Sequence, residues 1–154
     1  MPVKDTARRQ YARIADQAVS ASAGLDLPRE GWIRTVRKAL GMSGAQLARR
    51  MRVTRARIAQ AEASELEGGI TLKSMHVAAE AMGCRFVYAV IPSSTIESMI
   101  LSQAYAKASK LVREADSHMA LENQAVGETI YQKNIERLAN QFASDMPTDL
   151  WDKL

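Results

Sequence analysis

The 154-residue chain is long enough to bury the core of one domain, or of a small domain with an extension, and with only 5% aromatic residues that core must be mainly aliphatic. No apolar stretch reaches the ~18 residues that span a bilayer, and residues 1–17 lack the apolar region of a secretory signal, so we expect a soluble, cytoplasmic protein. Residues 1–92 carry 15 Lys and Arg against 8 Asp and Glu, and residues 93–154 carry 6 against 9, which predicts a front half that contacts a polyanion and a back half with another role.

Two predicted helices open the chain. Residues 5–24 form the first, with Asp5 as its N-cap and Gly24 as a left-handed residue that ends it. One face of this helix carries Tyr11, Ile14, Ala15 and Ala18, and its other faces carry Arg8, Arg9 and Arg13. Residues 29–41 form the second helix, and its stripe toward the core consists of Trp32, Ile33, Val36 and Leu40.

Residues 43–64 predict two short helices joined by a tight turn. Ser43 and Thr54 are their N-caps, and the turn lies around Arg52. The positions where such helices cross are small or apolar: Leu47, Ala48, Met51, Val53, Ile58 and Ala61. When these face inward, the second helix turns outward a hydroxyl, two guanidinium groups and an amide, from Thr54, Arg55, Arg57 and Gln60. These groups contact phosphates and base edges in the major groove.

Residues 71–83 predict a further helix that is capped by Thr71. Residues 84–92 are rich in β-branched and aromatic side chains and end at Pro92, which predicts one short strand. Because a lone strand cannot pair its own backbone groups, we expect it to pair with a second copy or with a partner's edge. The only cysteine, Cys84, is expected to be a buried small hydrophobe in a reducing compartment.

The back half predicts a pair of helices, one from residue 96 to about residue 123 and one over residues 128–143. A tail follows, in which Trp151 is the expected anchor. The only two histidines, His76 and His118, have no cysteine or carboxylate at ligand spacing, so we predict no metal site and no cofactor. No nucleophile and base occur together, so we predict that the protein is not an enzyme.

Residues 43–62 (SGAQLARRMRVTRARIAQAE) followed by residues 70–83 (ITLKSMHVAAEAMG) resemble a Cro/C1-type (XRE-type) helix-turn-helix, with the resemblance covering residues 29–83. It implies a mainly all-α fold: a lambda-repressor-like domain with one short strand and a C-terminal helical extension. Most of the chain is similar to the family called mobile mystery protein A. Three segments carry this resemblance: CRFVYAVIP (84–92), SELEGGITLKS (64–74) and HMALENQ (118–124). Members are typically encoded beside a Fic-domain protein, which implies the regulator and antitoxin of a Fic-type toxin–antitoxin pair.

This organisation predicts four segments. An N-terminal helix or arm spans residues 1–28, the DNA-binding domain spans 29–83, the short strand spans 84–92, and a partner-binding or dimerisation region spans 93–154. The predicted DNA-binding residues are Ser43, Gln46, Arg49, Arg50, Arg52, Thr54, Arg55, Arg57 and Gln60. The chain departs from the motif twice, because Arg52 occupies a turn position usually held by glycine and Gly44 replaces a phosphate-contacting glutamine.

The segment HMALEN, residues 118–123, resembles a helix that restrains many Fic enzymes. In the pattern [S/T]xxxE[G/N], the glutamate pairs with an arginine that would otherwise hold the γ-phosphate of ATP. The resemblance implies partner-inhibitory roles for Glu122 and Asn123, and for His118 in the place of Ser or Thr. The alternative is a glutamate on the solvated face of a helical hairpin.

The sequence therefore predicts a dimeric, sequence-specific transcriptional repressor that binds an inverted repeat of double-stranded DNA and inhibits a Fic-domain toxin. A second hypothesis is an inhibitory partner of a Fic enzyme with little regulatory DNA binding. A third is a basic amphipathic protein that adsorbs to membranes or RNA, which the scarcity of aromatic residues disfavours.

Overall fold

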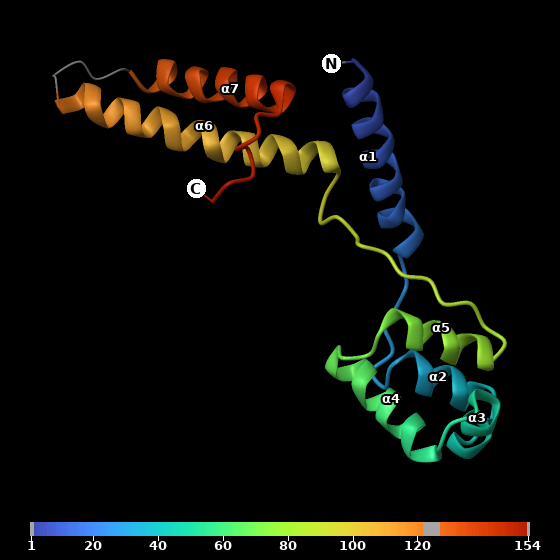
Figure 1. Cartoon of the computed structure of the whole chain (residues 1–154). Helices are drawn as coiled ribbons and strands as arrows, with labels where there is room; N and C mark the ends of the chain where they lie inside the picture. The colour runs from blue at the N-terminus through green and yellow to red at the C-terminus, as the bar shows by residue number, and fades with distance from the viewer. Residues whose placement is uncertain (1, 122–126, 154) are drawn as a thin grey trace. The chain divides into compact units, whose positions relative to one another are not determined.

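The computed structural model describes residues 2–121 and 127–153, and most of them are helical (Figure 1). The chain divides into two compact units: Ala23–Ala89, here called the middle unit, and Met1–Ser22 with Val90–Leu154, here called the terminal unit. Among the described residues there are seven helices: α1 (Pro2–Ser22), α2 (Trp32–Ala39), α3 (Gly44–Met51), α4 (Arg55–Glu67), α5 (Leu72–Ala81), α6 (Ile96–Leu121) and α7 (Glu128–Asp145). Within this described part, no helix has the length and apolar content that a membrane span requires.

The middle unit contains α2 to α5 around one small core. Its buried residues are Ile33, Leu47, Ala48, Ile58, Met75, Ala78 and Met82. The predicted inward positions Leu47, Ala48 and Ile58 are confirmed, whereas Val53 in the turn is 38% exposed. The predicted stripe of the second helix is only half correct, because Trp32 and Leu40 are exposed.

Local capping chemistry explains where three of these helices begin. The Ser43 hydroxyl accepts from the Gln46 N–H at 3.2 Å while the Gln46 amide accepts from the Ser43 N–H at 2.7 Å, a reciprocal capping box. Thr54 accepts from Arg57 N at 3.2 Å, and Thr71 does the same for Ser74 at 3.1 Å. The predicted N-caps Ser43, Thr54 and Thr71 are confirmed, whereas the predicted N-cap Asp5 is wrong, because α1 begins at Pro2 and Asp5 lies within its first turn.

The predicted strand at residues 84–92 is wrong, since the described residues contain no strand. A strand needs the edge of another strand, and no other extended segment pairs with this one, so its backbone remains outside any ladder. Only Phe86 packs against the core, and its ring meets the edge of His76 at a centroid distance of 5.1 Å. Val87 and Tyr88 are exposed, and so is Cys84, which corrects the expectation of a buried thiol.

In the terminal unit, α6 and α7 run side by side in opposite directions (Figure 1). Ala108, Ile135 and Ala139 are buried between them, and the alanines allow a close approach of the two helices. Asp16 on α1 accepts from the N–H of Ile96 at 2.9 Å and so satisfies a free backbone donor at the start of α6. The predicted pair of helices is confirmed.

The tail is anchored by Leu150 rather than by the predicted Trp151. Leu150 is fully buried, and its carbonyl accepts from the Gln103 side chain at 2.8 Å, whereas Trp151 is exposed. Lys107 on α6 donates to both the carbonyl and the carboxylate of Asp149 at 2.7 Å. Leu150, the residue before the predicted anchor Trp151, is therefore the one that the turn after α7 buries.

Candidate nucleic-acid interface

The turn between α3 and α4 is built around Arg52, which has φ 56° and ψ 43°. This is the left-handed conformation that the glycine position of the motif requires, so the expected backbone is present without the glycine. The next residue, Val53, donates from its N–H to the carbonyl of Ala48 at 2.9 Å and closes the turn. Holding a non-glycine residue here costs roughly 1–2 kcal/mol.

Two of the three acids of α4, Glu62 and Glu65, face α2. Glu62 accepts from Nε of Arg37 on α2 at 2.7 Å, and both side chains are largely buried. Glu65 accepts from the backbone N–H groups of Trp32 and Ile33 at 2.5 and 3.0 Å, and so caps α2 across the unit. With these two carboxylates directed toward α2, the charge exposed along the first turns of α4 is positive.

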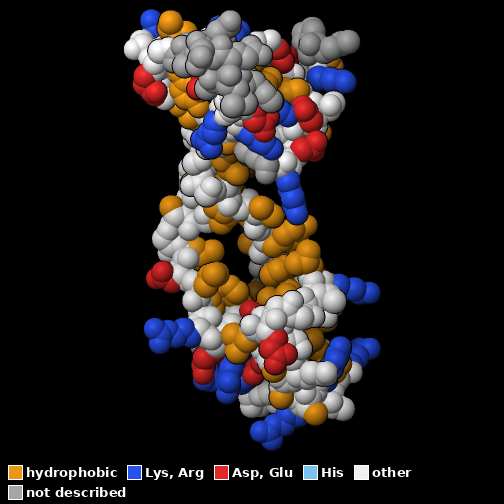
Figure 2. All heavy atoms as spheres, turned by 90° about the vertical axis from the view of Figure 1, so that its left-hand side faces the viewer, with side chains coloured by type: hydrophobic (Ala, Val, Ile, Leu, Met, Phe, Trp, Pro, Cys, Tyr) orange, Lys and Arg blue, Asp and Glu red, His pale blue; other side chains and the backbone are white. Residues whose placement is uncertain are grey.

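All nine predicted DNA-binding residues are exposed, and they come from α3, the turn and α4. Lys and Arg side chains project from several sides of the middle unit, as Figure 2 shows in blue at its lower end. On α4, Arg57 donates from Nη1 to the Gln60 amide oxygen at 2.8 Å, so these two side chains form a pair on the outer surface. Guanidinium and amide groups in this arrangement present hydrogen-bond donors to a groove.

Besides the paired Arg57 and Gln60, four of the predicted residues already make side-chain hydrogen bonds within the protein: Ser43, Gln46, Arg50 and Thr54, whose hydroxyl caps α4. The polar groups of Ser43 and Gln46 form the capping box of α3. Arg50 donates from Nε to the carbonyl of Ala81 and thereby caps the end of α5. Within the part of the chain that the structure describes, the guanidinium groups of Arg49 and Arg52 have no hydrogen-bond or ion-pair partner. These two are free to contact a phosphate.

A cleft of 450 Å³ lies between α4 and the start of α5. Arg57 and Gln60 line one side of it, and Thr71, Lys73 and Ser74 line the other. The sequence interpretation did not include these last three residues. Lys73 lies in the first turn of α5, where the free N–H groups of the helix add positive potential. A capping threonine followed two residues later by lysine is the local signal that could have identified them.

A second cleft, of 340 Å³, borders α3 and is lined by Gln46, Arg49 and Arg50 together with residues 40–42. It brings three of the predicted residues together on the helix that precedes the turn. The two clefts share no lining residue.

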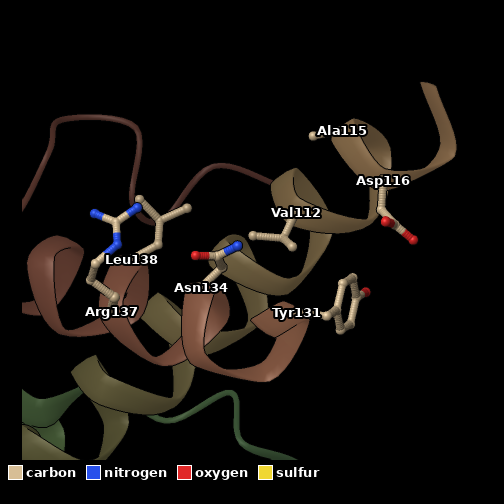
Figure 3. A pocket seen from close by; sticks show the side chains of 7 residues that line it. All are labelled: Val112, Ala115, Asp116, Tyr131, Asn134, Arg137 and Leu138. Atoms are coloured by element: carbon tan, nitrogen blue, oxygen red, sulfur yellow. The ribbon is translucent and has the colours of Figure 1, made fainter. Parts of the chain in front are cut away.

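The predicted partner-inhibitory residues belong to the terminal unit. Glu122 and Asn123 lie outside the described residues, and only the backbone of His118 is described, within α6. Near this end, α6 and α7 enclose a pocket of 230 Å³ lined by Val112, Ala115, Asp116, Tyr131, Asn134, Arg137 and Leu138 (Figure 3). Oδ1 of Asp116 is buried and has no hydrogen-bond partner among the described residues.

Residues 33–88 match a family model described as helix-turn-helix, of the Cro/C1 (XRE) type. Comparison with curated proteins and with solved structures gave no match. The matched range begins at the second residue of α2 and contains α3 to α5, the left-handed turn and both clefts. The middle unit is therefore a helix-turn-helix domain, which supports binding to double-stranded DNA and points to a regulator rather than an enzyme. Among the described residues, no group of three His, Cys, Asp or Glu side chains could hold a metal ion.

Proposed function

We propose that this protein is a dimeric, sequence-specific transcriptional repressor that places α4 in the major groove of an inverted repeat. The observation that carries the proposal is the outer face of α4, where Arg57 and Gln60 are exposed beside a cleft while both inner carboxylates face α2. In a dimer, two such helices would contact half-sites about 34 Å apart, one turn of DNA.

The proposed contacts fall into two classes. Thr54, Arg55, Arg57 and Gln60 contact base edges, and each good bidentate pair is worth ~1–3 kcal/mol of discrimination. Arg49, Arg52 and Lys73 lie around this face and contact phosphates, which position the domain without distinguishing bases. Arg50, whose guanidinium caps α5, contributes charge from a fixed position. Arg8, Arg9 and Arg13 on α1 are an alternative set of phosphate contacts.

The test is an operator selection followed by titration of the full chain against the selected duplex and a scrambled one. Arg57→Ala should lose affinity for the operator and little for scrambled DNA, because a base contact is removed. Arg49→Ala should weaken binding to both duplexes and make the salt dependence shallower, because a phosphate contact is removed. Arg113→Ala, on α6, is the matched control and should bind like the wild type. Equal losses on both duplexes for Arg57→Ala and Arg49→Ala would refute the assignment.

We propose further that the same chain is the antitoxin of a Fic-domain protein. The support is the resemblance of residues 118–123 to the inhibitory helix of Fic enzymes and the net negative charge of residues 93–154. The competing proposal, an inhibitory partner with little regulatory DNA binding, is favoured by the same segment. Co-expression with the product of the neighbouring gene, which this proposal expects to be a Fic protein, separates them when it is repeated with Glu122→Gly.

Each outcome of that co-expression has a distinct meaning. Partner activity that returns with Glu122→Gly while operator binding persists would support both functions in one chain. Partner inhibition by wild-type protein that lacks operator binding would favour the inhibitory partner alone. If Glu122→Gly leaves the inhibition unchanged, residues 118–123 do not inhibit the partner through Glu122.

A further inference from the structure

The middle unit exposes apolar side chains on a face that the proposed DNA contacts do not use. We call this the apolar patch; it consists of Leu25, Trp32, Val87 and Tyr88. Tyr88 is 68% exposed, and its ring stacks on that of Phe86 at a centroid distance of 6.2 Å. Figure 2 shows such side chains, in orange, on the upper part of this unit. The patch exposes on the order of 500 Å², as much as the largest apolar patch of a typical monomer.

A pocket of 240 Å³ opens within the patch. It lies between α2, α5 and the two segments that flank them, and its walls include Trp32, Met75, Met82, Phe86 and Val87. Arg85 is the one charged residue of the lining. A cavity of about 150 Å³ holds a benzene molecule, so this pocket admits the ring of an aromatic side chain.

We infer that the apolar patch is the contact between two copies of the chain, with Tyr88 of each copy entering the pocket of the other. The geometry of a two-fold dimer requires one surface that is complementary to itself. This patch provides both parts, because Val87 lines the pocket and the exposed Tyr88 stacks on Phe86, another residue of its lining. A surface with only an apolar projection or only a pocket would need a different partner.

The area of the apolar patch also supports a second copy of the chain as the partner. Two patches of this size bury together about 1,000 Å², the lower limit for a specific protein interface. The near absence of charge in the patch avoids the like-charge repulsion that a symmetric contact otherwise brings. The inference rests on the proposed function, in that an inverted repeat needs two recognition helices. No residue that lines this pocket lines the cleft of Arg57 and Gln60, so the dimer leaves α4 free.

The first experiment measures the oligomeric state of the full chain by sedimentation velocity over a wide range of concentration. Wild type should be a dimer, and Tyr88→Asp and Val87→Asp should each raise the dissociation constant by roughly tenfold or more, as expected for a buried anchor. Tyr11→Asp is the matched control, since Tyr11 is 72% exposed on α1 and should not affect association. A monomeric wild type, or dissociation caused by Tyr11→Asp and not by the patch variants, would overturn the inference.

The second experiment uses the only cysteine as a probe. Cys84 is exposed and lines the pocket, so its alkylation by N-ethylmaleimide reports whether the pocket is covered. Alkylation should slow as protein concentration rises, and the slowing should be absent in Tyr88→Asp. Protection that does not depend on concentration would mean that the chain's own terminal unit or a small apolar molecule fills the pocket, and it would overturn the inference. Rapid alkylation at every concentration would show that no second copy covers the pocket, and it would also overturn the inference.

DNA binding by the same variants separates this inference from the proposed function. A monomeric Tyr88→Asp should bind a half-site duplex like wild type and lose the additional affinity for the full inverted repeat. Wild type that dimerises through the patch but binds no operator would refute the repressor and leave the interface intact. Wild type that binds the operator while both patch variants dimerise normally would refute only the interface.

Discussion

Arg37 on α2 donates through Nε to Oε1 of Glu62 on α4 at 2.7 Å, and the two side chains are only 13% and 12% exposed. The same guanidinium donates through Nη1 to the carbonyl of Met42 at 2.9 Å, just before α3. One largely buried ion pair therefore links α2 and the approach to α3 with the inner face of the proposed recognition helix. Its position explains how Glu62 is kept away from the outer surface of an arginine-rich helix pair.

Glu62→Leu should destabilise the middle unit by about 3 kcal/mol, because Arg37 then remains buried without a carboxylate. The double variant Arg37→Met with Glu62→Leu should recover most of that loss, because an apolar pair replaces the ion pair. Urea unfolding in a Trp151→Phe background measures this, since Trp32 is then the only tryptophan and lies in the middle unit. A double variant no more stable than Glu62→Leu would contradict the expectation.

Gly31→Ala should cost about 2–3 kcal/mol, for two reasons. Gly31 has φ 79°, and a Cβ placed there would lie 2.8 Å from Oε2 of Glu65, the carboxylate that caps α2. Gly41→Ala is the matched control, since Gly41 has φ 65° and open space around its Cα, so only the conformational cost of about 1 kcal/mol remains. The same fluorescence assay compares the two, and equal losses would show that the carboxylate moves aside freely.

Arg52→Gly should raise stability by about 1 kcal/mol, because glycine tolerates the left-handed conformation of this turn. It should also lower operator affinity on the order of threefold to tenfold and make the salt dependence shallower, because the proposed phosphate contact is lost. Arg52→Ala separates the two effects, since alanine removes the charge but keeps the strain. If operator affinity is unchanged in both variants, Arg52 makes no phosphate contact that offsets the cost of its left-handed conformation.

Arg57 and Gln60 should behave as a unit in operator binding. A guanidinium can only donate, so the amide atom that faces Arg57 is the oxygen, and the Gln60 NH₂ remains free as a donor. The selected operator should then present acceptors from guanine or thymine rather than a bidentate adenine. In a double-mutant cycle, Arg57→Ala and Gln60→Ala should couple by about 0.5–1.5 kcal/mol, whereas Arg49→Ala and Gln60→Ala should be additive.

Glu30 should titrate below its ordinary pKa of 4.5, because the Lys38 ammonium donates to both carboxylate oxygens at 2.9 and 2.8 Å. Since the pKa is lower in the folded protein, the stabilisation is present above pH 4.5 and is lost as the pH falls through the folded value. Lys38→Met should return the pKa toward 4.5 in an NMR titration. Asp149 is the internal control, because its pKa is lowered by Lys107 in the terminal unit and should not change.

The features that were predicted correctly depend on residues close together in the chain. Ser43, Thr54 and Thr71 cap helices through N–H groups three residues ahead, so a short stretch of sequence contains both partners. The left-handed conformation of Arg52 was not predicted, because no glycine marks the turn; the structure shows that the turn between the two helices adopts it with an arginine. Leu47 and Ile58 were identified as core because helical periodicity places them on facing stripes.

The sequence by itself therefore determined where the helices lie, the caps of α3, α4 and α5, and the outward set from Thr54 to Gln60, because these depend on local hydrogen bonds and on a 3.6-residue period. Only the tertiary structure decided which apolar residues are covered, since burial depends on neighbours that are distant in the chain. Trp32 and Cys84 face a pocket rather than the core, Leu150 replaces Trp151 as the anchor, and residues 84–92 form no strand because no other strand lies beside them. The direction of Glu62 and Glu65 toward α2, which leaves the outer face of α4 basic, is likewise a result of packing between helices.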